Sequence, residues 1–471
     1  MRLFLLDFIL FGKGTFPYNK VMVHNKGWVP MVINFSLRQV LLLLIVTLTG
    51  VVWSVIFHHP LVVGFFPGYL ILVLFSIKKG KSMKQILHIS FLGVNKTRIV
   101  ILILFLVSLL LPSWYLAGTI QQMVKIALHF IIPHHFLVLS FLSAMIFSML
   151  LGTTVGTLSA IGIPIIGTAI VLQLPVEMVA GALVSGAFVG DRTSPFSSAH
   201  QLLSHTIELP VKRQWNAMLF TTVAAIILCF CFYGIADFLH SNSTPSSQQL
   251  LSWNEVSLIK FIPPLILITF VLLRISIVYA FLTSIISAAG IALYSGASVD
   301  KLVFSLWHGI EGLGGGFLHM YELLLFLALA GAYNGLLEEM NVIQPYLDKW
   351  LQSSRSLTGD TLKTLVATLL ITLIAANQTL PIILTGRSFL PHWSSKYGKE
   401  ELARVMGDTT MLFPGVVPWS VLAIMCSTIV GIPLLDYLPY ALFLWILPIL
   451  TILVSLVKQA RKTKKYRRAI A

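Results

Sequence analysis

The chain has 471 residues, of which 57% are hydrophobic and only 10% are charged, with a formal net charge of +15. A soluble fold cannot bury that much apolar surface, so the composition indicates a polytopic membrane protein. The positive charges lie in loops and in the tail, as expected for cytoplasmic segments of membrane proteins, which argues against nucleic-acid binding.

The N-terminal segment, residues 1–34, begins with an apolar run that is too short to span. We expect this segment to be cytoplasmic or interfacial. Alternatively, translation starts later, at Met22 or Met31, and the residues before that point are not part of the protein. The Lys-rich stretch between residues 78 and 98 is expected to be a cytoplasmic loop, which places the N-terminus in the cytoplasm. Spans are predicted at 38–57, 60–77 and 98–119, followed by an amphipathic, interfacial or re-entrant segment at 120–133.

Metal chemistry has little support in the sequence. His129, His134 and His135 are close together, but Pro133 disturbs the helical spacing and no carboxylate is near, so ordinary side chains are favoured over ligands. The three cysteines lie inside apolar runs and fit neither a disulfide framework nor a metal site. We expect no cofactor, and no metal beyond a transported cation.

A run of small and hydroxyl residues, 152–160, interrupts an apolar segment that starts at residue 135. A broken membrane helix is tolerated where the break is buried in protein or lines water, and Thr153, Thr154 and Thr157 would then line a pathway. Tight helix packing through small residues is the alternative, and both readings stay open. Apolar segments follow at 161–174, 177–190 and 215–239.

The stretch 181–201 carries an acid out of an apolar, small-residue segment. Its centre reads Gly190-Asp191-Arg192-Thr193-Ser194-Pro195-Phe196-Ser197. Gly190 and Pro195 predict a helix break at the carboxylate, where freed backbone groups and hydroxyls can bind a small cation. An acid at such a break usually faces a cavity or a pathway. The alternative is a helix cap at the membrane surface, with Asp191 paired to Arg192.

A polar linker without basic residues, 240–256, divides the chain near its middle and is expected outside the cell. It separates a first transmembrane repeat, 35–239, from a second, 257–457. The segment from Arg387 to Arg404 is expected to be a cytoplasmic loop, and the basic tail 458–471 to lie on the cytoplasmic lipid surface. Spans of the second repeat are predicted at 257–273, 276–295, 319–337, 361–376 and 437–457.

The two halves share a pattern. Each holds Gly-Asp followed by hydroxyl residues and a proline-broken apolar segment, at Gly190-Asp191 and at Gly407-Asp408 with Pro414. An external linker between two cytoplasmic termini gives each half an odd number of spans, so the halves are inverted. The predicted fold is an all-α membrane protein with about 10–12 transmembrane segments, in two inverted-topology repeats with discontinuous helices.

At these residues the sequence resembles the NhaC-type sodium/proton antiporter family of bacteria, over about residues 35 to 455. The resemblance implies exchange of a monovalent cation for protons, or organic-anion exchange coupled to them, since the family includes malate/lactate exchangers. Where the family carries further acids, this chain has Ser198, Asn377 and Gly407. The motifs that carry the resemblance are 152–157, 190–197, 384–389, Arg404, Asp408, Pro418-Trp419, 431–433 and 437–441.

The expected site centres on Asp191, which would trade a proton for a cation in a dry cavity. Arg192 and Arg387 would neutralise Asp191 and Asp408 or bind an anionic substrate. His200 is a candidate proton carrier, with a hydrogen-bonding residue at a helix end as the alternative. The other expected cation- or proton-binding residues are Thr193, Ser194, Ser197, Asp408 and Asn377. The expected pathway-lining residues are Thr153, Thr154, Thr157, Glu338, Arg192, Arg387 and His200. Glu338 would gate, coordinate or form a surface pair.

The predicted function is a secondary antiporter of the cytoplasmic membrane that exchanges Na⁺ or another monovalent cation for H⁺. An organic-anion or amino-acid exchanger is the alternative. A membrane enzyme would need a nucleophile–base pair or a metal cluster, and the sequence offers neither in or near the spans. The paired broken-helix motifs argue against a channel. Expected partners are Na⁺, H⁺ and membrane lipid, without nucleic acid, and a homodimer is left open.

Overall fold

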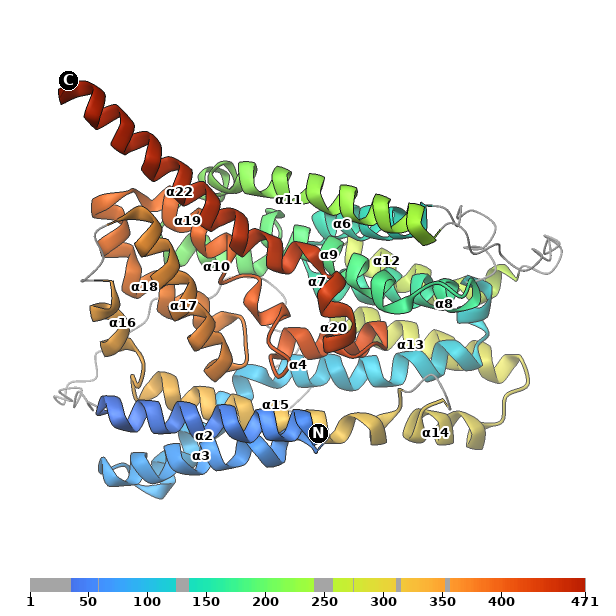
Figure 1. Ribbon diagram of the computed structural model, residues 1–471. Helices are drawn as coiled ribbons and strands as arrows, with labels where there is room; N and C mark the ends of the chain where they lie inside the picture. The colour runs from blue at the N-terminus through green and yellow to red at the C-terminus, as the bar shows by residue number, and fades with distance from the viewer. Residues whose placement is uncertain are drawn as a thin grey trace. The chain divides into compact units, whose positions relative to one another are not determined.

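The computed structural model describes residues 35–57, 59–123, 135–240, 257–273, 275–310, 315–351 and 356–470. Within these ranges nine helices are long and apolar enough to cross a membrane, and one bent helix pair adds a tenth candidate. Most of the helices run along a common direction (Figure 1). The prediction of an all-α polytopic membrane protein is confirmed. The predicted N-terminal segment, the external linker from residue 241 onward, and His129 and His134 lie outside the described residues.

The membrane helices differ widely in length. A π turn at Leu158–Gly162 joins α7 (Thr154–Thr157) to α8 (Ile163–Val171) in a single candidate span. The long helices are α2 (Leu37–Ile56), α3 (Leu61–Lys78), α4 (Met83–Leu116), α11 (Val211–His240), α13 (Ile277–Tyr294), α15 (Phe317–Glu339), α17 (Leu357–Ala375) and α22 (Leu442–Ile470). The remaining helices are α6 (Phe136–Leu151), α9 (Val176–Thr193), α10 (Ser198–Thr206), α12 (Ile262–Leu272), α14 (Val299–His308), α16 (Gln344–Trp350), α18 (Thr379–Lys396), α19 (Lys399–Asp408), α20 (Val421–Val430) and α21 (Leu434–Tyr437).

Helix α4 replaces a predicted loop. The segment 78–98 is helical from Met83 onward and continues without a break into the span predicted at 98–119. Ser82 starts the helix with a capping box, in which its hydroxyl accepts the Gln85 N–H and the Gln85 side chain accepts the Ser82 N–H. The loop prediction was wrong because lysines indicate a position near the membrane surface while remaining good helix formers.

The prediction of a loop from Arg387 to Arg404 was also wrong, because helices α18 and α19 cover most of this segment. Helix α18 continues past Arg387, and α19 starts after Gly398, whose φ of +98° allows a sharp reversal. Glu400 and Glu401 occupy the first turn of α19, where negative charge is favourable. The last helix starts at Leu442, later than predicted, and carries the basic tail as far as residue 470.

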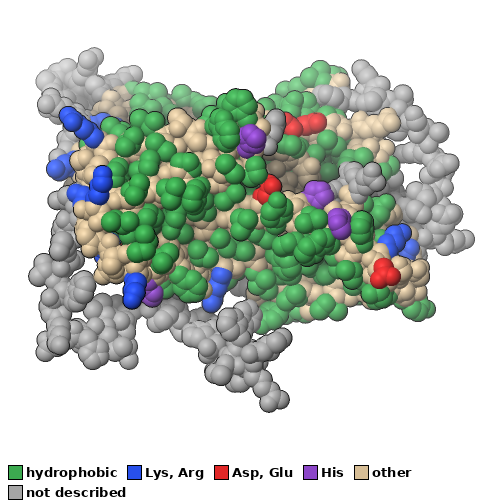
Figure 2. Space-filling view, turned by 90° about the horizontal axis from the view of Figure 1, so that it is seen from below, with side chains coloured by type: hydrophobic (Ala, Val, Ile, Leu, Met, Phe, Trp, Pro, Cys, Tyr) green, Lys and Arg blue, Asp and Glu red, His purple; other side chains and the backbone are tan. Residues whose placement is uncertain are grey.

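Apolar side chains cover much of the outer surface. Ile45 on α2, Leu74 on α3 and Phe238 on α11 are exposed, Phe238 by 78%. Figure 2 shows a face on which hydrophobic side chains form a broad band while most Lys and Arg gather toward one end. This surface suits contact with lipid, and the helices satisfy their own backbone groups as lipid requires.

Glycines bring α6 and α9 into close contact. A Cβ on Gly190 would lie 2.0 Å from the carbonyl carbon of Ser148. The Ser148 hydroxyl donates to the Gly186 carbonyl at 2.9 Å and accepts the Gly190 N–H at 2.9 Å. Small residues of this kind allow close helix packing in membranes.

We expect Gly190→Ala to lower the yield of folded protein sharply, because backbone atoms that cannot move aside occupy the space that the new methyl group needs. Gly234→Ala on α11 is the matched control, since its Cβ would meet only Val138, at 3.9 Å. Size-exclusion chromatography after detergent extraction compares the two variants. Equal monodisperse yields would contradict the packing argument.

The same order of broken helices occurs in both halves. Helix α6 ends at Gly152 and α17 at Ala376, both in the left-handed conformation, with φ of +70° and +53°. A non-helical segment then separates α9 from α10 at 194–197 and α19 from α20 at 409–420, the latter with one 3-10 turn. We call 152–153, 194–197, 376–378 and 409–420 the four breaks. Their order is compatible with the predicted inverted repeats.

Candidate ion-binding site

The two breaks of each half contact each other. In the first half, a Cβ on Gly152 would lie 2.6 Å from the carbonyl carbon of Phe196, so the two breaks touch. In the second half, Gln378 Nε2 donates to the Met411 carbonyl at 3.0 Å, and the N–H of Val421, directly after the fourth break, donates to the carbonyl of Ala376 at 2.8 Å. Backbone groups that a helix break releases are thus partly satisfied by the neighbouring break, as a broken membrane helix requires.

Asp191 lies where the two halves meet. It is on the last turn of α9 and only 7% exposed. Its Oδ2 accepts a hydrogen bond from Gln378 Nε2 at 3.1 Å, and the backbone of Thr154 lies close to the carboxylate. Gln378 Nε2 lies 3.0 Å from the Met411 carbonyl as well. In the described part of the chain no cationic side chain forms an ion pair with Asp191, so this is a buried carboxylate with a neutral donor.

The first-half break follows the acid instead of containing it. Helix α9 continues through Gly190 and Asp191 to Thr193, so the prediction that Gly190 interrupts the helix was wrong. Pro195 does stop the helix, because the residue before a proline disfavours the helical conformation, and Ser194 is extended with ψ of 135°. Asp191 is therefore held by a regular helix, which fixes the direction of its side chain.

The hydroxyls expected around Asp191 are buried, but only one contacts this residue. Ser197 Oγ donates to the Asp191 carbonyl oxygen. Ser194 Oγ donates to a carbonyl of α6 at 2.8 Å, and Thr193 Oγ1 donates to the Val189 carbonyl at 2.5 Å. The break thus brings Ser197 to Asp191 and directs the other two hydroxyls toward α6 and α9.

The three threonines at and directly after the first break make different contacts. Thr153 caps α7 by accepting the Gly156 N–H at 3.5 Å, and Thr157 Oγ1 donates to the Thr153 carbonyl at 2.8 Å. Among the residues that the structure describes, the buried Thr154 hydroxyl has no hydrogen-bond partner, and neither has that of Ser420 just before α20. Buried polar atoms are rarely left unpaired, so these two oxygens are free to coordinate a cation.

Arg192 pairs with Asp408 of the other half. Its Nη2 contacts Asp408 Oδ1, and both side chains are fully buried. Two hydroxyls of α11 hold the pair: Arg192 Nη1 donates to Thr222 Oγ1 at 2.5 Å, and Thr221 Oγ1 donates to Asp408 Oδ1 at 3.0 Å. The alternative in which Arg192 neutralises Asp191 is therefore wrong, and Arg192 neutralises Asp408 instead.

Asn377 and Glu338 make contacts of other kinds. Asn377 Oδ1 accepts the Leu380 N–H at 2.9 Å and so caps the start of α18. Glu338 forms an ion pair with Lys96 at 2.8 Å, and both side chains are about half exposed or more. The structure therefore shows the surface pair that was one of the readings of Glu338.

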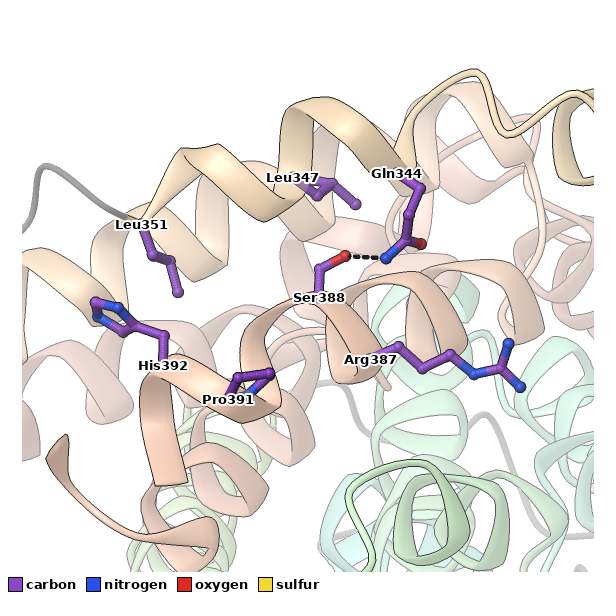
Figure 3. Close-up of a pocket in the computed structure, with 7 residues that line it drawn as sticks. All are labelled: Gln344, Leu347, Leu351, Arg387, Ser388, Pro391 and His392. Carbon is purple, nitrogen blue, oxygen red and sulfur yellow. Dashed lines mark hydrogen bonds between the residues drawn. The ribbon is translucent and has the colours of Figure 1, made fainter. Parts of the chain in front are cut away.

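Arg387 is exposed on α18, roughly 13 Å along the helix axis from Gln378. It lines a pocket between α16 and α18 and does not contact Asp191 or Asp408. Figure 3 shows its guanidinium pointing away from the hydrogen bond between Gln344 and Ser388 that spans this pocket. The structure thus separates Arg387 from both acids that it was expected to neutralise.

His200 is fully buried at the start of α10. Its backbone N–H donates to Ser197 Oγ at 3.2 Å, while its ring nitrogens face the Thr193 and Ser194 carbonyls without a hydrogen bond of good geometry. The ring is also within electrostatic range of Arg192, where a second positive charge is repelled. This position argues against His200 as the proton carrier.

Sequence reasoning missed Gln378 and Ser420. Gln378 follows Asn377 at a predicted span end, which gave no sign that its amide reaches Asp191 across the two halves. The oxygens of a carboxylate, hydroxyls and backbone suit a hard cation such as Na⁺, and the same carboxylate can hold a proton instead. Among the residues that the structure describes, no cluster of three or more His, Cys, Asp or Glu side chains could hold a metal ion.

The chain is similar in sequence to a known family of membrane transporters. The model of the Na⁺/H⁺ antiporter family matches residues 210–458. The chain is 28% identical over 371 residues to the Na⁺/H⁺ antiporter NhaC of Bacillus subtilis, covering 74% of this chain and 82% of that protein. It is 24% identical over 414 residues to the malate-2H⁺/Na⁺-lactate antiporter of the same organism, covering 84% and 88%. It is also 24% identical over 367 residues to the arginine/ornithine antiporter ArcD of Halobacterium salinarum, covering 72% and 75%.

Proposed function

Because the chain belongs to the Na⁺/H⁺ antiporter family, we propose that it exchanges Na⁺, or another monovalent cation, for H⁺ across the cytoplasmic membrane. The observation that carries this proposal is the state of Asp191. It is a buried carboxylate, and the side chain that donates a hydrogen bond to it among the described residues is the neutral amide of Gln378. A carboxylate without a counter-charge in a dry site is strongly driven to take up a cation or a proton.

Asp191 serves both ions in turn. With a cation bound, Asp191 supplies the negative charge, and the hydroxyl oxygens of Ser197 and Ser420, at two of the breaks, and of Thr154, directly after the first break, supply neutral ligands. With a proton bound, the carboxyl group is neutral and the cation leaves. Competition for one group couples the two fluxes, because each ion can cross only when the other has left.

Purified protein in liposomes with a trapped pH dye tests the proposal. An external pulse of Na⁺ should raise the internal pH as protons leave, and parallel pulses of Li⁺ and K⁺ should rank the cations. Protein-free liposomes give the background. A flat trace with all three cations, in sealed vesicles shown to contain protein, would refute cation/proton exchange.

An organic-anion or amino-acid exchanger is the second candidate, favoured by two relatives that are named for exchanging malate with lactate and arginine with ornithine. Such a substrate carries a carboxylate that needs a cationic partner. Arg192 is paired with Asp408, and Arg387 lies at the pocket between α16 and α18. No cationic partner is therefore left for an anion near Asp191, and this region favours a cation. Uptake of labelled malate, lactate or arginine into the same liposomes separates the two candidates.

The candidate spans make this a multi-pass membrane protein. We propose that both termini lie in the cytoplasm, since the basic tail follows the last span. A C-terminal green fluorescent protein should then fluoresce, while alkaline phosphatase fused at the same point should stay inactive. The reverse result would place the tail outside. A homodimer is tested by light scattering of the purified protein in detergent.

A further inference from the structure

Four carboxylates are buried in the described segments of the chain: Asp191, Asp237, Asp360 and Asp408. Asp237 accepts the backbone N–H groups that start α6, at 2.9 and 3.0 Å, so it is a helix cap. Asp360 bonds His392 at 2.9 Å and the Tyr397 hydroxyl at 2.8 Å, near the pocket of Figure 3 and apart from the four breaks. These two acids have permanent structural partners.

Asp408 shares its site with a positive charge that belongs to the protein. The Arg192 guanidinium makes four contacts that fix it: with Asp408, with Thr221 at 3.1 Å, with Thr222 at 2.5 Å and with the Gly407 carbonyl at 2.9 Å. To leave this place during a transport cycle the guanidinium would have to give up all four contacts and leave Asp408 buried without its counter-charge. In this structure the pair is neutral, and Asp408 offers no net charge to a transported ion.

The other polar groups at the four breaks are neutral. Gln378 and Asn377 are amides, and the hydroxyls of Thr368, Thr385 and Thr410 bond one another at 2.9 and 3.3 Å. Two other titratable side chains lie close to this region. The thiol of Cys426 on α20 is fully buried in an apolar segment, and the His200 ring faces Arg192, where a second positive charge is repelled. Asp191 thus carries the one uncompensated charge among the described residues of this region.

We propose that exchange is electroneutral, one Na⁺ for one H⁺, because Arg192 acts as a built-in counter-charge that leaves Asp191 as the only exchangeable carboxylate. This inference rests on the proposed cation/proton exchange. In one half-cycle a carboxylate–Na⁺ pair crosses, and in the other the carboxylic acid crosses. Both forms have zero net charge, so no charge moves across the membrane in a full cycle.

The test uses wild-type protein in liposomes with a trapped pH dye, with valinomycin and K⁺ gradients setting the membrane potential. At fixed internal pH, proton flux should reverse direction when the Na⁺ concentration ratio across the membrane equals the H⁺ concentration ratio. This reversal point should be the same whether the membrane potential is zero or inside-negative. A reversal point that moves with the potential would overturn the inference while leaving the exchange itself established. A complete lack of Na⁺-driven flux would instead overturn the proposed function.

A variant tests the part played by Arg192. Arg192→Gln leaves Asp408 as a second uncompensated carboxylate, so the reversal point of this variant should become potential-dependent. The double change Arg192→Gln with Asp408→Asn restores a neutral pair and should restore a potential-independent reversal point. Electroneutral exchange by correctly folded Arg192→Gln would show that Arg192 is not the counter-charge. If the single variant does not fold, the wild-type reversal point still decides the stoichiometry.

Discussion

Asp191→Asn is expected to reduce Na⁺-driven proton efflux from liposomes to the level of protein-free vesicles while leaving the protein as stable as the wild type or more stable. Asparagine keeps the shape of the side chain and an oxygen that can accept the Gln378 amide N–H. It cannot release a proton, and it offers no charge to a cation. Removing a buried charge that lacks a counter-ion also removes a desolvation cost.

The matched control is Glu338→Gln, which makes the same change from acid to amide on the exposed pair with Lys96. Exposed pairs contribute little, so this variant should transport within about twofold of the wild type. Transport is measured with the trapped pH dye, and stability by the melting temperature in detergent. If Asp191→Asn releases protons as fast as the Glu338→Gln variant, Asp191 has no part in the mechanism.

Sequence patterns predicted the class of fold and the places where helices stop. Gly152 and Pro195 act locally, because a left-handed residue, or a residue that precedes a proline, ends a helix whatever surrounds it. The resemblance to a cation/proton antiporter family is likewise confirmed, since the family model matches more than half of the chain. The predictions of loops at 78–98 and from Arg387 to Arg404 were wrong, because charge indicates where a segment lies and does not exclude a helix.

The partners within the site could not be read from the sequence. Arg192 follows Asp191 directly, yet neighbouring residues on a helix point about 100° apart, so they face different surroundings. One side chain reaches Gln378 and the other reaches Asp408, each across the two halves of the chain. Only the packing of α9 against the breaks and helices of the second half decides which acid is neutralised and which stays uncompensated.

Asp408→Asn should have the opposite effect to Asp191→Asn and destabilise the protein strongly. It leaves the Arg192 guanidinium fully buried without its counter-charge. Breaking a buried ion pair in this way costs about 3–5 kcal/mol. Replacing both partners with apolar residues, as in Arg192→Met with Asp408→Leu, should recover much of that loss, because no buried charge then remains.

The cysteines supply the readout for this comparison. Cys229 and Cys426 are buried and Cys231 is exposed, so a thiol-reactive dye in a Cys231→Ser background reports unfolding. The control is Arg213→Gln, which breaks the exposed pair with Glu400 and should cost less than about 1 kcal/mol. If Asp408→Asn melts like this control, the Arg192–Asp408 pair does not hold the two halves together. If the double variant melts as low as Asp408→Asn, the loss comes from packing and not from the unpaired charge. A low melting point for Asp408→Asn alone, beside an unchanged one for Asp191→Asn, would separate the acid that stabilises the fold from the acid that carries the ion.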